Sequence, residues 1–119
     1  MYNEFMIKQS ITAIIGELLN QRNWRLSVAE SCTGGLLADQ ITDTPGASQY
    51  FVGGIVAYAY EAKVKLLGVE WVVLEQYGAV SAEVVLQMAR GARLALDTDV
   101  ALSISGIAGP GGATPDKPV

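Results

Sequence analysis

Apolar residues recur along this chain with a helical period in two long stretches. Residues 4–20 place apolar side chains three or four positions apart, which predicts an amphipathic helix. The same spacing predicts a second long helix after Ser81, which is a candidate cap. The two apolar stripes are Ile7, Ile11, Ile14, Ile15, Leu18 and Leu19 in the first helix, and Val84, Val85, Met88, Ala89, Ala92 and Leu96 in the second. Each stripe is expected to face the core.

Two shorter helices are predicted between the long ones. One covers Gly34–Ile41, with Thr33 as its candidate N-terminal cap. The other covers Glu61–Leu67 and ends at Gly68, because glycine readily adopts the left-handed conformation that closes a helix. Residues 69–80 are interpreted as a connection with room for one helical turn.

Three further stretches are apolar and lack helical spacing, so they are predicted as buried strands. They cover Leu26–Ala29, Tyr50–Tyr58 and Asp99–Ser105, and the second is rich in aromatic and β-branched residues. A turn is expected at Thr44–Gly46, and the Gly-rich loop GIAGPGG follows the last strand at 106–112. Because helices alternate with buried strands, the sequence predicts a layered α/β domain.

Composition narrows the classes of function. With 119 residues, half of them apolar and 17% charged, the chain is expected to form one globular domain. Its net charge of -4 and the lack of a basic run argue against nucleic-acid binding, although loop amides can still bind a small anion. The chain has no histidine, which excludes a Ser-His or Cys-His pair, and its single cysteine nearly excludes zinc. One cysteine, no signal-peptide pattern and no apolar span of membrane length predict a cytoplasmic protein.

The stretch SVAESCTGG at 27–35 is the first candidate site. Ser31 follows a predicted strand and precedes a Gly-rich helix start, where free amides would stabilise an oxyanion or a phosphate. The alternative is a capping serine in an ordinary turn. Glu30 would orient a partner group or bind a substrate amide, and a simple ion pair is the alternative. Cys32 has no histidine to activate it and fits a small buried side chain better than a nucleophile.

The stretch YAYEAKVKLLG at 58–68 is the second candidate. Lys63 lies between an apolar strand and a short helix, so it is a candidate for burial. Burial would lower the pKa of Lys63 and make it a base. The alternative is that Lys63 is an exposed lysine on the helix. Lys65 is expected to face solvent. The loop from Ser105 onward follows the end of a strand, which is where α/β sheets bind ligands, so it is a candidate binding loop. The alternative is that it is only a long turn. The motifs GxxxxGK[ST], GxGxxG, GxSxG and SxxK are absent.

Three blocks occur together in order: AESCTGGLLADQIT, GGIVAYAYEAKVKLLGV and SISGIAGPGG, joined by YGAVSAEVVLQMARGAR. They resemble the C-terminal domain of the CinA family, which also occurs alone as nicotinamide-nucleotide amidase. The resemblance covers nearly the whole chain after the first helix. It implies a three-layer α/β/α sandwich with a mixed sheet, similar to the anticodon-binding-domain fold. The family continues past KPV into a strand and a helix, so the single domain 1–119 is expected to lack these two elements.

The resemblance implies that nicotinamide mononucleotide is hydrolysed to nicotinate mononucleotide and ammonia without a metal or other cofactor. The family's catalytic serine, lysine and tyrosine fall on Ser31, Lys63 and Tyr58. Lys63 would accept the Ser31 proton directly or through Tyr58, and amides of the Cys32–Gly35 turn would stabilise the oxyanion. The phosphate is expected against loop amides near Gly106–Gly112 or against a cationic side chain. The residues expected to bind substrate are Glu30, Cys32, Thr33, Gly34, Gly35, Ser105, Gly106, Gly109 and Gly111.

One position departs from the family pattern, because Tyr60 stands where the family commonly has asparagine. A ring there would fill or reshape the pocket, which favours an alternative: a non-catalytic module that holds a nucleotide or a partner. A different amide or peptide hydrolase with the same residue pair is a third possibility. The expected partners are a small nucleotide substrate and, by family resemblance, a second copy of the chain, with no nucleic acid and no membrane.

Overall fold

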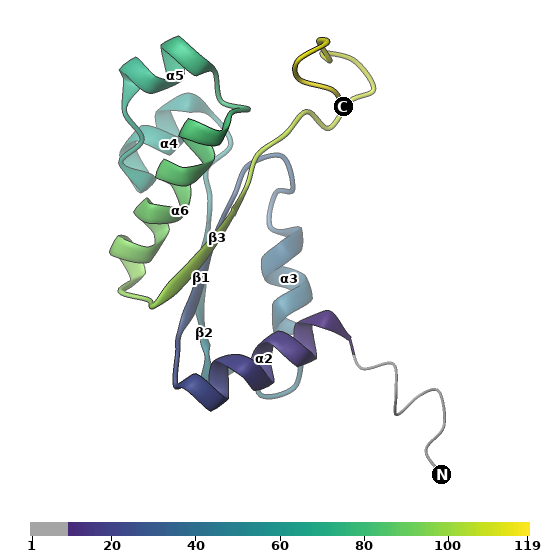
Figure 1. The fold of residues 1–119 in the computed structure, drawn as a ribbon, viewed down its shortest axis with the longest axis vertical. Coiled ribbons are helices and arrows are strands. Elements are labelled where there is room, and N and C mark those ends of the chain that lie inside the picture. The colour runs from purple at the N-terminus through teal and green to yellow at the C-terminus, as the bar shows by residue number, and fades with distance from the viewer. Residues whose placement is uncertain (1–9) are drawn as a thin grey trace.

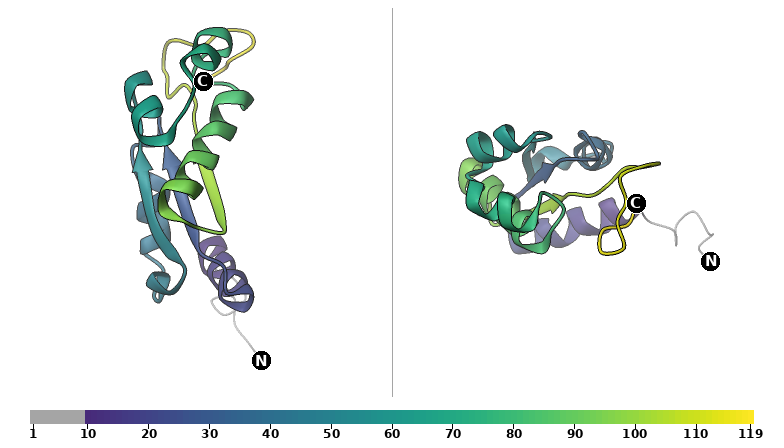
Figure 2. Two further views of the ribbon diagram at one scale, coloured as in Figure 1. Left: turned by 90° about the vertical axis from the view of Figure 1, so that its left-hand side faces the viewer. Right: turned by 90° about the horizontal axis from the view of Figure 1, so that it is seen from above.

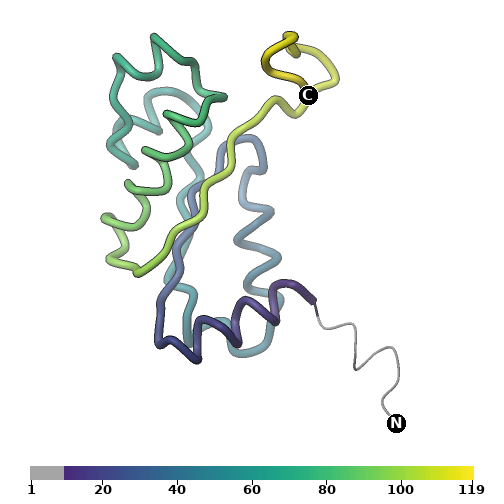
Figure 3. The backbone as a smooth tube through the Cα atoms, in the orientation of Figure 1, coloured from purple at the N-terminus to yellow at the C-terminus, as the bar shows by residue number. Residues whose placement is uncertain are grey.

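Three parallel strands form the centre of the fold (Figure 1). The computed structural model describes residues 10–119. Strand β1 (Leu26–Glu30) lies between β2 (Phe51–Val56) and β3 (Val100–Ile104), and both pairings are parallel. The helices are α2 (Ile11–Arg22), α3 (Leu36–Thr42), α4 (Tyr60–Leu67), α5 (Trp71–Tyr77) and α6 (Ala82–Leu96), with a short 3₁₀ turn η1 (Ala47–Gln49). Because the strands run in one direction, their carboxyl ends meet at one edge of the sheet, as the trace in Figure 3 shows.

Helices cover both faces of the sheet, which gives three layers (Figure 2). Helices α4, α5 and α6 cover one face, where Ala29 of β1 joins their apolar side chains. Helices α2 and α3 lie on the other face with Val28 of β1. Successive strand residues point to opposite faces, so the central strand contributes to both cores and all of its residues are buried.

Helix α6 packs closely against the end of α4. A Cβ atom added at Gly91 would lie 1.9 Å from the carbonyl oxygen of Leu67, so this contact requires a glycine in α6. Gly68 ends α4 with a φ of 67°, and its N–H donates to the carbonyl of Val64. The α4–α6 contact holds the start of α4 beside the carboxyl edge of the sheet.

The α/β class is confirmed, and so is the cap of α6, where Ser81 Oγ accepts the N–H of Val84. The expected connection at residues 69–80 contains a full helix, α5, because Leu74 is buried in the core. The implied mixed sheet differs from the structure, since both pairings within residues 10–119 are parallel. Each strand here reaches the next through a helical crossover, which is the connection that parallel strands need.

The first predicted helix is confirmed only in part. Helix α2 begins after Ser10, whose side chain accepts the N–H of Ala13, and the predicted core residue Ile7 lies outside the described residues. Two residues of the helix are buried, Gly16 and Leu19, and Gly16 lies against the ring of Tyr50. Three members of the predicted stripe are exposed: Ile11, Ile14 and Leu18. No helix within residues 10–119 has the length and apolarity needed to cross a membrane.

Candidate active site

The carboxyl edge of the sheet brings three distant segments together around one pocket. Ser31 follows β1, Tyr58 follows β2, and Ser105 follows β3. The pocket has a volume of about 440 Å³. It is lined by the predicted residues Ser31, Cys32, Tyr58, Lys63, Ser105, Gly106, Gly109 and Gly111, and also by Ala79, Val80, Ile107, Ala108 and Gly112. The predicted residues Glu30, Thr33, Gly34 and Gly35 are not part of its lining.

Lys63 is the most buried charged side chain at this edge, with 0% exposure. It projects from the first half of α4, and its Nζ lies 2.9 Å from Ser31 Oγ. The same amine donates to the carbonyl oxygens of Ala57 at 2.9 Å and Tyr58 at 2.7 Å. Burial lowers the pKa of Lys63 from its ordinary value of 10.5, and the nearby Cys32 side chain acts in the opposite direction.

These three contacts decide which protons the amine can exchange. Carbonyl oxygens only accept hydrogen bonds, so two N–H groups of Lys63 are directed at Ala57 and Tyr58. The remaining position of the nitrogen faces Ser31 Oγ, whose residue is only 7% exposed. A neutral amine would present its lone pair there and accept the hydroxyl proton, and an ammonium would donate to the oxygen. The arrangement is that of a nucleophile with its general base.

Glu30 supports the turn after Ser31 and does not face the pocket. It is 1% exposed, and its carboxylate accepts four hydrogen bonds, from the Thr33 hydroxyl at 2.6 Å and from the N–H groups of Gly35, Leu37 and Ala38 at 3.2, 2.9 and 2.9 Å. Burial acts to raise the pKa of Glu30, but these hydrogen bonds together outweigh it and lower the pKa.

Two predictions about this turn are therefore corrected. The cap at the start of α3 is the distant carboxylate of Glu30 and not Thr33, whose hydroxyl donates to that carboxylate. A substrate-binding role for Glu30 does not fit its geometry, because its oxygens already accept hydrogen bonds from the turn and the helix. A carboxylate matches the free N–H groups and positive dipole end of a helix start better than a hydroxyl does.

The predicted oxyanion donors are reduced to one amide beside the nucleophile. The N–H of Gly34 donates to the Ser31 carbonyl at 3.1 Å, and the N–H of Gly35 donates to Glu30. These two groups are engaged within the turn. The N–H groups of Cys32 and Thr33 donate to no acceptor in residues 10–119, and of these two residues only Cys32 lines the pocket. The N–H of Cys32 is therefore the amide placed to stabilise negative charge next to Ser31.

The two tyrosines near Lys63 have different surroundings from those expected. The side chain of Tyr58 is 73% exposed at the pocket, and the contact of this residue with Lys63 is made by its backbone carbonyl. Tyr60 does not line the pocket, because its ring packs against Trp71 of α5 with 6.1 Å between ring centroids. The expected filling of the pocket by Tyr60 is thus wrong.

Sequence reasoning missed the carbonyl partners of Lys63 and one contact of the C-terminal segment. Lys117 Nζ donates to the carbonyl of Tyr77 at 2.7 Å, which ties the segment after the Gly-rich loop to the end of α5. Backbone carbonyls have no signature in the side-chain sequence, so no pattern could have found these contacts. The expected exposure of Lys65 is confirmed.

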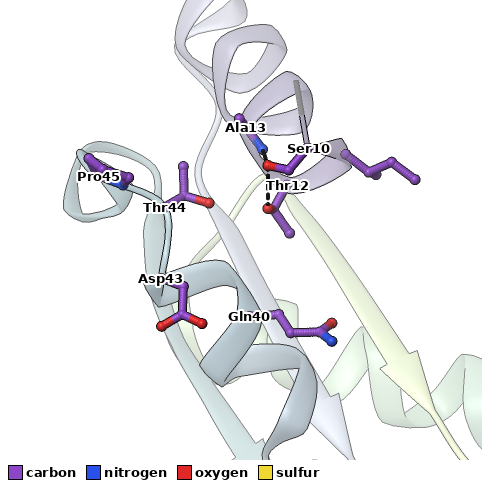
Figure 4. Close-up of a pocket in the computed structure, with 8 residues that line it drawn as sticks. Ser10, Thr12, Ala13, Gln40, Asp43, Thr44 and Pro45 are labelled. Atoms are coloured by element: carbon purple, nitrogen blue, oxygen red, sulfur yellow. Dashed lines mark hydrogen bonds between the residues drawn. The ribbon is translucent and has the colours of Figure 1, made fainter. Parts of the chain in front are cut away.

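A second pocket, of about 490 Å³, lies between the start of α2 and the end of α3 (Figure 4). Its polar groups include Ser10, whose Oγ caps α2 and lies 3.1 Å from Thr12 Oγ1. Among its lining residues within 10–119 there is no lysine, so these residues do not repeat the serine–lysine pair of the first pocket. Within residues 10–119, no group of three His, Cys, Asp or Glu side chains is arranged to hold a metal ion.

The fold and site together define an α/β domain with a buried serine–lysine pair at the carboxyl edge of a parallel sheet. Residues 8–119 match the family model described as the CinA C-terminal domain. The chain therefore belongs to the CinA family.

Relatives agree with this assignment. A CinA-like protein of Shewanella denitrificans is 57% identical over 112 residues, which is 94% of this chain and 26% of that protein. The CinA superfamily protein of Escherichia coli has a solved structure with 34% identity and a TM-score of 0.88, over 99% of this chain and 69% of that one. A competence/damage-inducible protein from Agrobacterium tumefaciens gives 40% identity and a TM-score of 0.83, over 91% and 66%. The chain spans about a quarter of the length of the curated relatives it matches.

Proposed function

We propose that this domain is an amidase in which Ser31 attacks a carboxamide and Lys63 is the base, with nicotinamide mononucleotide as the substrate. The observation that carries the proposal is the 2.9 Å contact between a fully buried lysine amine and a serine hydroxyl in a pocket. A buried lysine without a carboxylate partner is costly, and a lowered pKa suits it to accept a proton.

The proposed reaction has two stages, which are the formation of an acyl ester on Ser31 and the hydrolysis of that ester. Neutral Lys63 takes the Ser31 hydroxyl proton directly as Oγ forms a bond to the carboxamide carbon, and the Cys32 N–H stabilises the developing oxyanion. The ammonium of Lys63 then gives that proton to the departing nitrogen, so the C–N bond breaks and ammonia leaves an acyl ester on Ser31. Water, deprotonated by neutral Lys63, cleaves the ester to the carboxylate and restores the Ser31 hydroxyl.

The pocket is compatible with a mononucleotide. Its volume of about 440 Å³ falls in the usual range of small-molecule sites, roughly 300–1,000 Å³. One wall is the Gly-rich loop, which includes Gly106, Gly109 and Gly111, and backbone amides of such loops can bind phosphate. Among the described lining residues, Lys63 is the one lysine or arginine, and its amine is already shared among Ser31 and two carbonyls. The phosphate is therefore assigned to loop amides.

The test is release of ammonia from nicotinamide mononucleotide by the purified chain. Ser31→Ala and Lys63→Met are each expected to lower kcat by about a thousandfold or more, because nucleophile and base act as a unit. Lys65→Met is the matched control, since Lys65 is exposed on the same helix. Ammonia release that survives Ser31→Ala would refute the mechanism.

The same assay separates the alternatives. Binding of the nucleotide without ammonia release would support the non-catalytic module. Turnover of other carboxamides in its place would support a different amide hydrolase with the same residue pair. The argument that Tyr60 blocks the pocket no longer favours the module, because that ring packs on Trp71.

A further inference from the structure

The side chain of Tyr58 has no evident structural task in the fold. It is 73% exposed although it lines a pocket, and its backbone carbonyl makes the contact with Lys63. The neighbouring Ala57 is buried, and its N–H donates to the Glu30 carbonyl at 2.8 Å. The backbone on both sides of the ring is thus held while the ring stands at the pocket, so it is placed to contact a ligand.

The other residues that line the pocket indicate which kind of ligand the Tyr58 ring would contact. Within residues 10–119, Tyr58 is the one aromatic residue of the lining, whose other members are mostly small or aliphatic. No aspartate or glutamate among the described residues lines the pocket. A positively charged flat group that enters it would therefore find an electron-rich aromatic face in the Tyr58 ring.

The substrate proposed above contains such a group, because the ring of nicotinamide mononucleotide is a cationic pyridinium. We propose that the Tyr58 ring is the platform on which this cationic ring lies, which makes Tyr58 a specificity-determining residue and not a proton carrier. The inference rests on the proposed function. It also accounts for the exposure of the ring, since a stacking face must be open to receive the substrate.

The geometry argues against a proton relay through Tyr58. Lys63 Nζ already lies 2.9 Å from Ser31 Oγ, so the proton can pass between them without an intermediate group. The phenol makes no hydrogen bond to either residue within residues 10–119. Its part in the site is therefore assigned to the ring face, which both tyrosine and phenylalanine possess.

The experiment measures binding by calorimetry in the Ser31→Ala protein, which cannot turn the substrate over. The two probes are nicotinamide mononucleotide and its 1,4-dihydro form, which keeps the carboxamide and phosphate but has an uncharged ring. Tyr58→Leu is expected to weaken binding of the cationic probe by about 3- to 30-fold and of the neutral probe by clearly less. Tyr58→Phe is expected to restore affinity for the cationic probe.

Tyr60→Leu is the matched control, because Tyr60 lies two residues away and outside the pocket lining. It should leave the affinity of both probes unchanged. Equal losses for both probes, no loss in Tyr58→Leu, or no rescue by Tyr58→Phe would each overturn the platform and leave the proposed function standing. If Tyr58→Phe in the Ser31 protein abolished ammonia release at unchanged affinity, Tyr58 would be a proton carrier. Failure of the Ser31→Ala protein to bind nicotinamide mononucleotide would overturn the proposed function together with the platform.

Discussion

The environment of a single residue, Lys63, decides what the pocket can do. Lys63 is fully buried, and its amine contacts two carbonyl oxygens and one hydroxyl. None of these three groups carries a full charge, so they compensate only part of the cost of burying an ammonium. Burial therefore lowers the pKa of Lys63, and the lysine becomes available as a base in a chain that has no histidine.

The pH dependence of the reaction follows from this shift. Lys63 acts as a base only when neutral, so kcat/KM should rise about tenfold per pH unit below the pKa and level off above it. Because burial lowers the pKa, the plateau should begin below the ordinary lysine value of 10.5. A pH profile of ammonia release checks this. If kcat/KM keeps rising up to pH 10.5, or if it falls as the pH increases through the neutral range, Lys63 is not the base.

At the scale of the element, the start of α3 depends on one carboxylate from the preceding strand. Glu30 accepts N–H groups of the first turns, which otherwise have no partner inside the helix. The same contacts hold the turn that carries Ser31 and Cys32. The shape of this turn, and with it the direction of the Cys32 amide, therefore rests on Glu30.

Glu30→Gln is expected to lower the free energy of unfolding by about 1–3 kcal/mol, because the amide nitrogen cannot accept the hydrogen bonds that a carboxylate oxygen accepts. Urea denaturation near neutral pH measures the loss, and exposed Glu75→Gln is the control. The folded-state pKa of Glu30 is lowered, so its contribution is present above the ordinary value of 4.5 and is lost as pH falls through the folded-state pKa. An equal effect of the two substitutions would contradict the capping role.

The packing of α4 against α6 depends on a glycine at position 91. Gly91→Ala would bring a methyl group to within 1.9 Å of the Leu67 carbonyl oxygen unless the helices separate. Alanine gains up to about 1 kcal/mol in helix propensity, but overpacking costs about 1–3 kcal/mol, so we expect net destabilisation. Thermal denaturation checks this, with Gly53→Ala as control because its added Cβ would meet Leu96 at an ordinary 3.6 Å. A stabilised Gly91→Ala protein would contradict the close packing.

At the scale of the whole molecule, the pocket depends on how the segment after β3 is held. Residues of this segment form one wall of the pocket, and Lys117 ties it to the carbonyl of Tyr77 in α5. Thr114 and Lys117 also exchange backbone hydrogen bonds of 2.9 and 3.1 Å, which fold the segment into a local turn. The wall is therefore positioned in part by its contact with the end of α5.

Lys117→Met should loosen this wall with little effect on the core. Hydrogen exchange measured by mass spectrometry is expected to become about tenfold faster or more in residues 106–119, since local opening free energies fall when a tether is lost. Exchange in β1 should not change, because all of its residues are buried at the centre of the sheet. Lys65→Met is the control for removing a lysine. Unchanged exchange in residues 106–119 would show that the tether does not order the wall.

The elements with strong periodicity, and the chemical groups that the site can use, can be predicted from the sequence alone. The α6 stripe of Val84, Met88 and Ala92 and its Ser81 cap are local features that spacing and residue type specify. The absence of histidine already limited the candidate bases, and the conjunction of three sequence blocks indicated the family. Weaker signals mislead: the pattern of residues 69–80 predicts a connection with room for one helical turn, where the structure has helix α5. The stripe of the first helix predicts core positions at Ile11, Ile14 and Leu18, which are exposed.

Only the tertiary structure decided how the site is assembled. Ser31 and Lys63 are 32 residues apart, and their contact exists because parallel pairing sets the ends of β1 and β2 side by side. The burial of Lys63, its two carbonyl partners, the capping role of Glu30 and the exposure of Tyr58 all depend on how elements cross. Residue types define which chemical groups a chain can offer. The pKa of each group, its exposure and its hydrogen-bond partners depend on the atoms around it. That environment forms only when distant segments pack together.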